Sequence, residues 1–168
     1  MHSVGVRRKR NPMEGHMITI KGIKTFQGHE DEGFNATLHI NGKKAASVIN
    51  EGNGGACYWR WEPGADKATW EAHVAGQPPW DCNGKMVPTD ADLTIALLIE
   101  GEKYKRDCRK GILFILEDSP NECRVLGYRK RVPTDMLAKV REQVVAKHGD
   151  KILEIINDRF GPEFGGKA

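Results

Sequence analysis

Gly52, Gly54 and Gly55 lie close together, with Asn50 and Asn53, directly before an aromatic stretch. Successive backbone N–H groups in such a glycine loop can form a concave site for an anion such as phosphate. The loop is not a P-loop, because no Gly-Lys-Ser/Thr follows it, and the glycine spacing and following helix of a dinucleotide fingerprint are also missing. Calcium takes about six to eight oxygen ligands, more than this loop offers. Two alternatives stay open: a tight turn without a ligand, or a contact with a ligand or partner.

The stretch Tyr58-Trp59-Arg60-Trp61 follows the glycine loop. In a strand, the two tryptophans share one face, and Tyr58 and Arg60 share the other. Burying one tryptophan of about 200 Å² is worth on the order of 5 kcal/mol, which favours the core for the tryptophan pair. Tyrosine and arginine are enriched at interface hot spots. The predicted partner-binding residues are therefore Glu51, Asn53, Gly54, Gly55, Tyr58 and Arg60.

Two basic segments in the second half of the chain, 103–110 and 124–131, offer a different chemistry. They would form one patch if the end of the predicted helix lies beside the following hairpin. With Tyr104 and Tyr128 nearby, such a patch is typical of nucleic-acid binding by phosphate contacts and stacking, although no helix-turn-helix or RNP motif accompanies it. The alternative is a solvated face partly offset by nearby acidic residues. The candidate residues are Lys105, Arg106, Arg109, Lys110, Arg129, Lys130 and Arg131.

The cysteines and histidines give no catalytic or metal signature. The four cysteines, at positions 57, 82, 108 and 123, include no CxxC pair, so zinc-ribbon spacing is absent. They are expected to be buried or free thiols, with a cysteine–histidine metal site as the alternative. Cys57 or Cys108 could serve as a nucleophile with His39 or His73 as base, but nothing in the spacing links them. We predict no metal and no cofactor, and the sequence favours a protein that is not an enzyme.

The composition is that of an ordinary soluble domain. The 168 residues are 39% hydrophobic and 29% charged, and the net charge of +3 permits an acidic partner without arguing for one. No apolar run approaches the roughly 18 residues of a membrane span, and no signal peptide is apparent at the start. The sequence therefore predicts no membrane association and a cytoplasmic location.

The pattern of residues predicts a single α+β domain over residues 17–160, preceded by a disordered basic leader at 1–16 and followed by a flexible tail at 161–168. Apolar residues alternate with polar ones from Met17 to Trp61, and Asn41-Gly42 is a strong hairpin signal. This half is predicted to be an antiparallel meander of three or four strands, with a kink at Gly22. A C-terminal hairpin is expected to be joined to this antiparallel sheet or to lie beside it, and three or four helices are expected to pack against the strands.

Separate local patterns predict the helices, strands and loops of the chain after Trp61. Pro78-Pro79 excludes a helix and a central strand, so 76–84 is expected to be an irregular loop with Trp80 at its tip. The strand at 111–116 is continuously apolar, which predicts burial on both faces. The other expected elements are a helix at 65–75, a helix from Thr89 with Leu93, Ala96 and Leu97 in the core, a turn at 119–121, a hairpin partner at 123–132, a helix from Pro133 to His148 and a last short helix from Asp150.

Several blocks, in this order, are similar to small uncharacterised proteins of phages and prophages. The resemblance covers most of residues 17–160 and carries no activity with it. It implies a protein that acts on a host component in the cytoplasm of an infected bacterium. We therefore expect a non-enzymatic binding protein that contacts a host protein, with a nucleic-acid-binding accessory protein as the alternative. The blocks are Gly33-Phe34-Asn35-Ala36-Thr37-Leu38, Asn41-Gly42-Lys43-Lys44, Gly52-Asn53-Gly54-Gly55, Cys108-Arg109-Lys110 and Lys147-His148-Gly149-Asp150-Lys151-Ile152, with a closing Ile-Asn-Asp-Arg-Phe.

Overall fold

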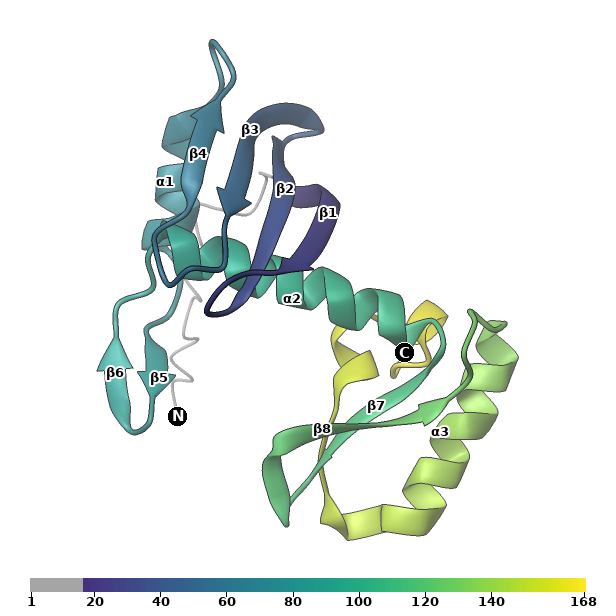
Figure 1. Cartoon of the computed structure of the whole chain (residues 1–168). Helices are drawn as coiled ribbons and strands as arrows, with labels where there is room; N and C mark the ends of the chain where they lie inside the picture. The colour runs from purple at the N-terminus through teal and green to yellow at the C-terminus, as the bar shows by residue number, and fades with distance from the viewer. Residues whose placement is uncertain (1–16) are drawn as a thin grey trace, which may run out of the picture. The chain divides into compact units, whose positions relative to one another are not determined.

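The computed structural model describes residues 17–168, so the predicted leader at 1–16 lies outside the described residues. The fold is α+β, with antiparallel sheets and, in the described part, three α-helices (Figure 1). The chain divides into two compact units, where the sequence predicted one domain over 17–160. Unit 1 ends at Ile99 and unit 2 is Glu100–Ala168, so the boundary falls within helix α2 (Ala91–Cys108).

Unit 1 is built on a four-stranded antiparallel meander of order β1-β2-β3-β4, as predicted. At the turn between β2 and β3, Asn41 and Gly42 have φ of 50° and 80°, the left-handed geometry that this pair favours. The predicted kink at Gly22 is also present, with φ of 61° and a register shift between Lys21 and Lys24. The strands are β1 (Ile18–Gln27), β2 (Glu32–Ile40), β3 (Lys43–Asn50) and β4 (Tyr58–Trp61).

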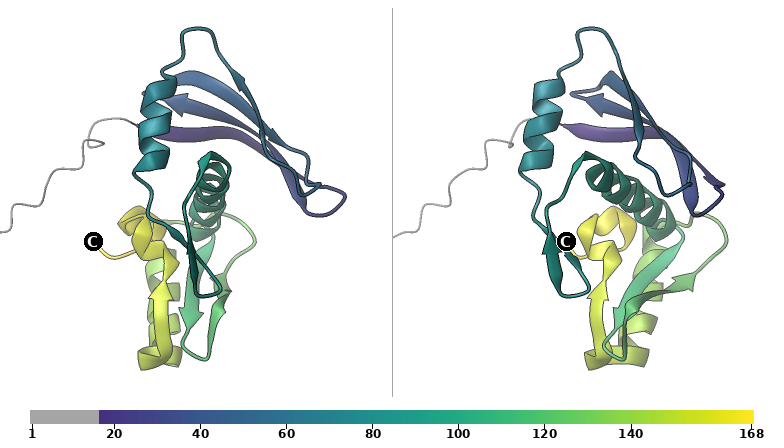
Figure 2. Two further views of the ribbon diagram at one scale, coloured as in Figure 1. Left: turned by 90° about the vertical axis from the view of Figure 1, so that its left-hand side faces the viewer. Right: turned by 60° about the vertical axis from the view of Figure 1, so that its left-hand side comes forward.

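One face of this sheet forms the core of unit 1. Helix α1 (Lys67–Ala75), capped by the Asp66 carboxylate, inserts Trp70 into that core, and α2 contributes Ile95 and Ile99. In Figure 2, α1 and α2 both lie beside the meander. Of the predicted core residues of α2, Ala96 is wrong, because it is exposed; Leu93 and Leu97 are half-buried, whereas Ile95 is fully buried. Apolar residues occur on several sides of this helix, so its periodicity alone did not identify the buried side.

Residues 80–87 form a second, two-stranded sheet of β5 (Trp80–Cys82) and β6 (Lys85–Val87). The prediction of an irregular loop with Trp80 at its tip was therefore wrong. Trp80 pairs with Val87 at the base of the hairpin, and the tip is Asn83-Gly84, both with positive φ. Both prolines precede the first residue of β5. They therefore prevent a helix here but do not interrupt the pairing of β5 with β6.

Unit 2 contains a three-stranded antiparallel sheet of order β8-β7-β9, with β7 (Gly111–Leu116) at its centre. Helix α3 (Thr134–His148) covers one face of β7. On the other face, Leu113 packs with Cys108, Ile156 and Phe164. The prediction that β7 is buried on both faces is confirmed. The flanking strands are β8 (Ser119–Gly127) and β9 (Ile152–Ile155).

Two local predictions in unit 2 were wrong. The turn before β8 lies at residues 117–118, because Leu116 already pairs with Ser119. Pro120 is tolerated within β8, because β8 is an edge strand. The predicted last helix is instead β9, between short 3-10 helices at Gly149–Lys151 and Ile156–Arg159. Residues 161–168, predicted to be a flexible tail, include another at Pro162–Phe164, whose Phe164 is buried.

The side chain of Asn157 is completely buried and forms hydrogen bonds with backbone groups of three segments of the chain. Its Oδ1 accepts a hydrogen bond from the Leu113 N–H at 2.8 Å. Its Nδ2 donates to the carbonyl oxygens of Gly111 at 2.9 Å, Cys108 at 3.4 Å and Phe164. This one amide therefore joins the end of α2, the start of β7 and the C-terminal segment.

The turn before β2 and the glycine loop after β3 are joined through one carbonyl oxygen. Gly52 O accepts hydrogen bonds from the N–H groups of Glu30 at 2.9 Å and Asp31 at 2.8 Å. Gly52 is buried with φ of 67°, and a Cβ there would collide with the Asp31 carbonyl oxygen. Glycine at this position is therefore required by both backbone geometry and space.

We predict that Gly52→Ala lowers the free energy of unfolding by about 2–3 kcal/mol, through left-handed strain plus the collision. Gly42→Ala is the matched control, because Gly42 has φ of 80° but no atom near its Cβ position. That variant should lose only about 1 kcal/mol. Urea denaturation followed by circular dichroism measures both, and equal losses would contradict the close approach at Gly52.

We predict that Asn157→Leu destabilises unit 2 by about 3 kcal/mol or more, because it leaves buried N–H and C=O groups without partners. Asn121→Leu, on the exposed part of β8, should change stability by only about 0.5 kcal/mol. Asn157→Asp provides a further test: it keeps the acceptor for Leu113 but aims a carboxylate at three carbonyl oxygens, so it should also destabilise. Denaturation midpoints near the wild-type value for the Asn157 variants would refute this role.

Candidate functional site

Two N–H groups of the glycine loop are hydrogen-bonded within the loop itself. The Gly52 N–H donates to Asn50 Oδ1 at 2.8 Å, and the Gly55 N–H donates to Asn53 Oδ1 at 3.1 Å. The Glu30 carboxylate lies close to Gly54, at the place where a Cβ on that residue would be. Its negative charge further disfavours an anion there. These contacts support the tight-turn interpretation over a phosphate site, since an anion nest needs N–H groups that point outward.

Asp92, which the sequence interpretation missed, fixes the chain between the glycine loop and β4. Its carboxylate accepts hydrogen bonds from the Cys57 N–H at 2.8 Å and from Trp59 Nε1 at 3.1 Å. Trp59 also stacks on Trp61, with 5.8 Å between ring centroids, and contacts Trp70 at 5.4 Å. An acidic residue in the first turn of a helix was the available signal, but it did not reveal the distant partners.

The predicted partner-binding residues lie in two places within unit 1. Glu51, Asn53, Gly54 and Gly55 are on the glycine loop, where Asn53 Nδ2 donates to Glu51 Oε2 at 3.1 Å. Tyr58 and Arg60 lie on β4 and are exposed, while both tryptophans of that strand are half-buried on the opposite face. The predicted alternation along β4 is therefore confirmed.

The outward side of the meander, called here the sheet face, consists of two rows of side chains that cross all four strands. The register pairs Tyr58 with Ile49, and 61% of Tyr58 and 42% of Ile49 is exposed. Phe26 lies near the end of β1 on the same side and is also exposed. The first row is Tyr58, Ile49, Asn35 and Lys24, and the second is Arg60, Ser47, Thr37 and Lys21.

In unit 2 the two predicted basic segments meet. The Tyr128 N–H donates to the Lys110 carbonyl oxygen at 2.8 Å, and the Val132 N–H donates to that of Arg109 at 3.1 Å. Gly111 and Gly127 pair directly, and a Cβ on either would collide with the facing backbone. The two glycines therefore permit the close approach that brings the segments together. We call this region the basic junction: Arg106, Arg109, Lys110, Arg129, Lys130 and Arg131.

The cations of the basic junction have different local partners. Arg106 and Lys110 lie 3.5 Å and 3.4 Å from Asp107, which offsets part of their charge. The Arg109 guanidinium lies 5.1 Å from the Phe164 ring centroid. The remaining three, at 129–131, are exposed and form no ion pair with any acidic residue in the described range 17–168. Lys105, the seventh predicted residue, lies over the Phe164 ring at 5.6 Å.

A cavity and an exposed aromatic ring accompany these cations. Arg109 and Arg131 line a cavity of about 320 Å³ together with Thr134 and Glu163. Tyr128, whose side chain is 48% exposed, is the residue directly before the 129–131 segment. The basic junction therefore combines positive charge with an accessible ring.

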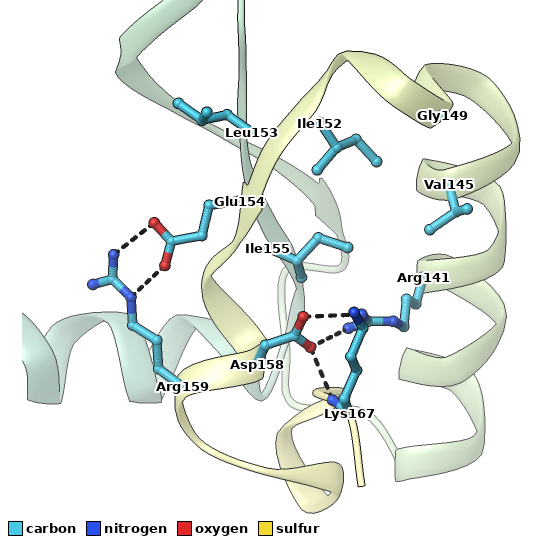
Figure 3. Close-up of a pocket in the computed structure, with 10 residues that line it drawn as sticks. All are labelled: Arg141, Val145, Gly149, Ile152, Leu153, Glu154, Ile155, Asp158, Arg159 and Lys167. Atoms are coloured by element: carbon cyan, nitrogen blue, oxygen red, sulfur yellow. Dashed lines mark hydrogen bonds and ion pairs between the residues drawn. The ribbon is translucent and has the colours of Figure 1, made fainter. Parts of the chain in front are cut away.

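A larger groove of about 700 Å³ lies between α3 and β9 (Figure 3). The sequence interpretation assigned no function to its residues. Arg141 forms a bidentate ion pair with Asp158, at 2.7 and 3.1 Å, and Arg159 forms another with Glu154, at 2.7 and 3.0 Å. Four of the charged side chains that line the groove are therefore paired with one another.

The thiols are not arranged for nucleophilic catalysis. All four cysteines are free, and none of the hydrogen bonds of Cys57 or Cys108 in the described chain involves His39 or His73. Burial raises the pKa of Cys57, and it raises the pKa of Cys108 to about 12. A nucleophilic cysteine needs a lowered pKa, so these environments oppose the reactive thiolate.

Within residues 17–168, no cluster of three or more histidine, cysteine, aspartate or glutamate side chains could hold a metal ion. In the same range, none of the helices has the length and apolar character that crossing a bilayer requires.

Comparison of the chain with protein-family models, with curated proteins and with solved structures gave no match.

Proposed function

We propose that this protein binds nucleic acid through the basic junction of unit 2. The observation that carries the proposal is the pair of backbone hydrogen bonds, Tyr128 to Lys110 and Val132 to Arg109, that joins two basic segments. Segments that are far apart in the sequence thereby form one positively charged region.

The chemistry of the basic junction suits the phosphate backbone. Clustered lysine and arginine side chains neutralise phosphates and release counterions, which supplies most of the free energy of non-specific binding. Tyr128 adds a ring on which a base can stack. Arg106 lies in the last turn of α2, whereas the other cations of the basic junction lie outside helices, so we propose binding with little sequence preference.

The first experiment replaces Arg129, Lys130 and Arg131 together by glutamine. We expect weaker binding to both duplex and single-stranded DNA, and a salt dependence whose log–log slope is smaller by about 1 for each phosphate that is no longer neutralised. Fluorescence anisotropy across a range of salt concentrations measures both quantities. The three side chains are exposed, so the fold should be preserved.

The matched control replaces Lys139, Lys147 and Lys151 by glutamine, which removes the same charge from exposed positions on α3 and the turn after it. If binding depended on net charge alone, both triple variants would lose affinity equally, and the basic junction would not be the site. No binding of the wild-type chain to nucleic acid at low salt would also contradict the proposal.

A second candidate function is contact with a host protein through the glycine loop, in a chain of phage or prophage origin acting in the bacterial cytoplasm. The observation that favours it is the rigidity of the loop, whose backbone is bonded to the turn at Glu30 and Asp31. A preorganised loop presents Glu51 and Asn53 without the entropic cost of ordering them on binding.

For this candidate we expect Glu51→Lys to abolish the recovery of a specific protein in pulldowns from a bacterial lysate, because the charge of an exposed side chain of the loop is reversed. Glu122→Lys, an equally drastic change at an exposed site of unit 2, is the control and should retain that protein. Equal recovery of every protein by the two variants and the wild type would sink the loop as a contact surface.

A further inference from the structure

We propose that the sheet face of unit 1 is a binding surface for single-stranded nucleic acid. Bases would stack on Tyr58, and phosphates would contact Lys21, Lys24 and Arg60. The surface lies in unit 1, whereas the basic junction lies in unit 2, so this inference goes beyond the proposed function and has its own evidence.

The geometry places an aromatic ring and cations on one extended surface. Tyr58 and Lys24 are the ends of one row across four strands, a span of about 14 Å at the usual strand spacing. The neighbouring row ends in Arg60 and Lys21, so each edge of the face has a cation. Phe26 adds a second exposed ring on β1, the strand farthest from Tyr58.

The charge of the sheet face is complementary to phosphate. No outward position within the four strands is a carboxylate in the ladder from Thr19 to Trp61. Acidic residues border the face: Glu32 is the first residue of β2 and lies on the inward side by strand alternation, and Asp31, Glu51 and Glu62 lie one residue beyond strand ends. Glu62 is 2.7 Å from Lys44, whose hydrogen bond lowers the pKa of that carboxyl, and Glu51 accepts a hydrogen bond from Asn53.

The same residues favour single-stranded nucleic acid over a protein as the occupant. Protein interfaces have apolar centres that are depleted of charge. Here Tyr58 and Ile49 are neighbours, but Asn35 and Lys24 lie between this pair and Phe26, and the second row holds only arginine, serine, threonine and lysine. Rings interspersed with cations and hydroxyls are instead the composition of a stacking platform, which requires bases that are not enclosed in a duplex.

The test measures binding of the full chain to a labelled oligothymidylate of about 16 nucleotides and to a duplex of the same length. Tyr58→Ala should weaken oligothymidylate binding about tenfold, because stacking on one ring contributes that much or more. Tyr58→Phe keeps the ring and should bind like the wild type. Duplex affinity should be unchanged in both variants.

Trp80→Ala is the matched control, because Trp80 is an exposed aromatic residue outside the sheet face. It should bind oligothymidylate normally. Lys21→Gln combined with Lys24→Gln should lower the salt slope for oligothymidylate by about 1 to 2. Circular dichroism checks that every variant is folded.

Repeating Tyr58→Ala in the triple glutamine variant at 129–131 distinguishes the contribution of the sheet face to binding from that of the basic junction. A loss of oligothymidylate affinity from Tyr58→Ala in both backgrounds supports the sheet face, whether or not the basic junction binds. Oligothymidylate affinity that Tyr58→Ala leaves unchanged overturns this inference, even if the triple variant fails to bind duplex. Equal losses of oligothymidylate affinity for Tyr58→Phe and Tyr58→Ala overturn it too. Phenylalanine keeps the ring, so such a result would assign the effect to the tyrosine hydroxyl and not to stacking.

Discussion

Unit 2 depends on the buried amide of Asn157. Its side chain bonds the last turn of α2, the first residues of β7 and the C-terminal segment. Apolar packing holds α3 against β7, but packing is non-directional and would not fix where α2 ends. The amide does fix it, because each of its hydrogen bonds is made to a backbone group of a different part of the chain and has a defined direction. Arg109 and Lys110 therefore leave the helix in a defined position.

Unit 1 fixes its loops in a comparable way, with polar groups rather than apolar area. The Gly52 carbonyl joins the ends of two hairpins, and Asp92 holds the approach to β4. Because these contacts and the inward face provide the stability, the outward residues of the meander carry little of it. Tyr58 could be replaced by many polar residues at small cost to folding, so its large exposed ring is not explained by the needs of the core.

Much of unit 1 could be predicted from sequence because its signals are local. Alternation with a period of two and the Asn41-Gly42 turn indicated the meander, and the same alternation placed Tyr58 and Arg60 outward. β9 was missed because Ile152, Ile155 and Ile156 also fit the spacing of a helix face. Its strand state is set by a distant partner, the free edge of β7. The meeting of the two basic segments likewise depends on the pairing of Gly111 with Gly127, which no local pattern reveals.

The two proposed surfaces differ in what each can recognise. The cations of the basic junction contact phosphates, which duplex and single strand share, so that surface provides affinity with little discrimination. Stacking on the sheet face requires an accessible base, which the single strand offers and the interior of a duplex does not. A chain that carries both would owe its salt dependence mainly to unit 2 and its preference for single strands to unit 1. This division follows from the residue types alone and does not require the two units to adopt any fixed arrangement.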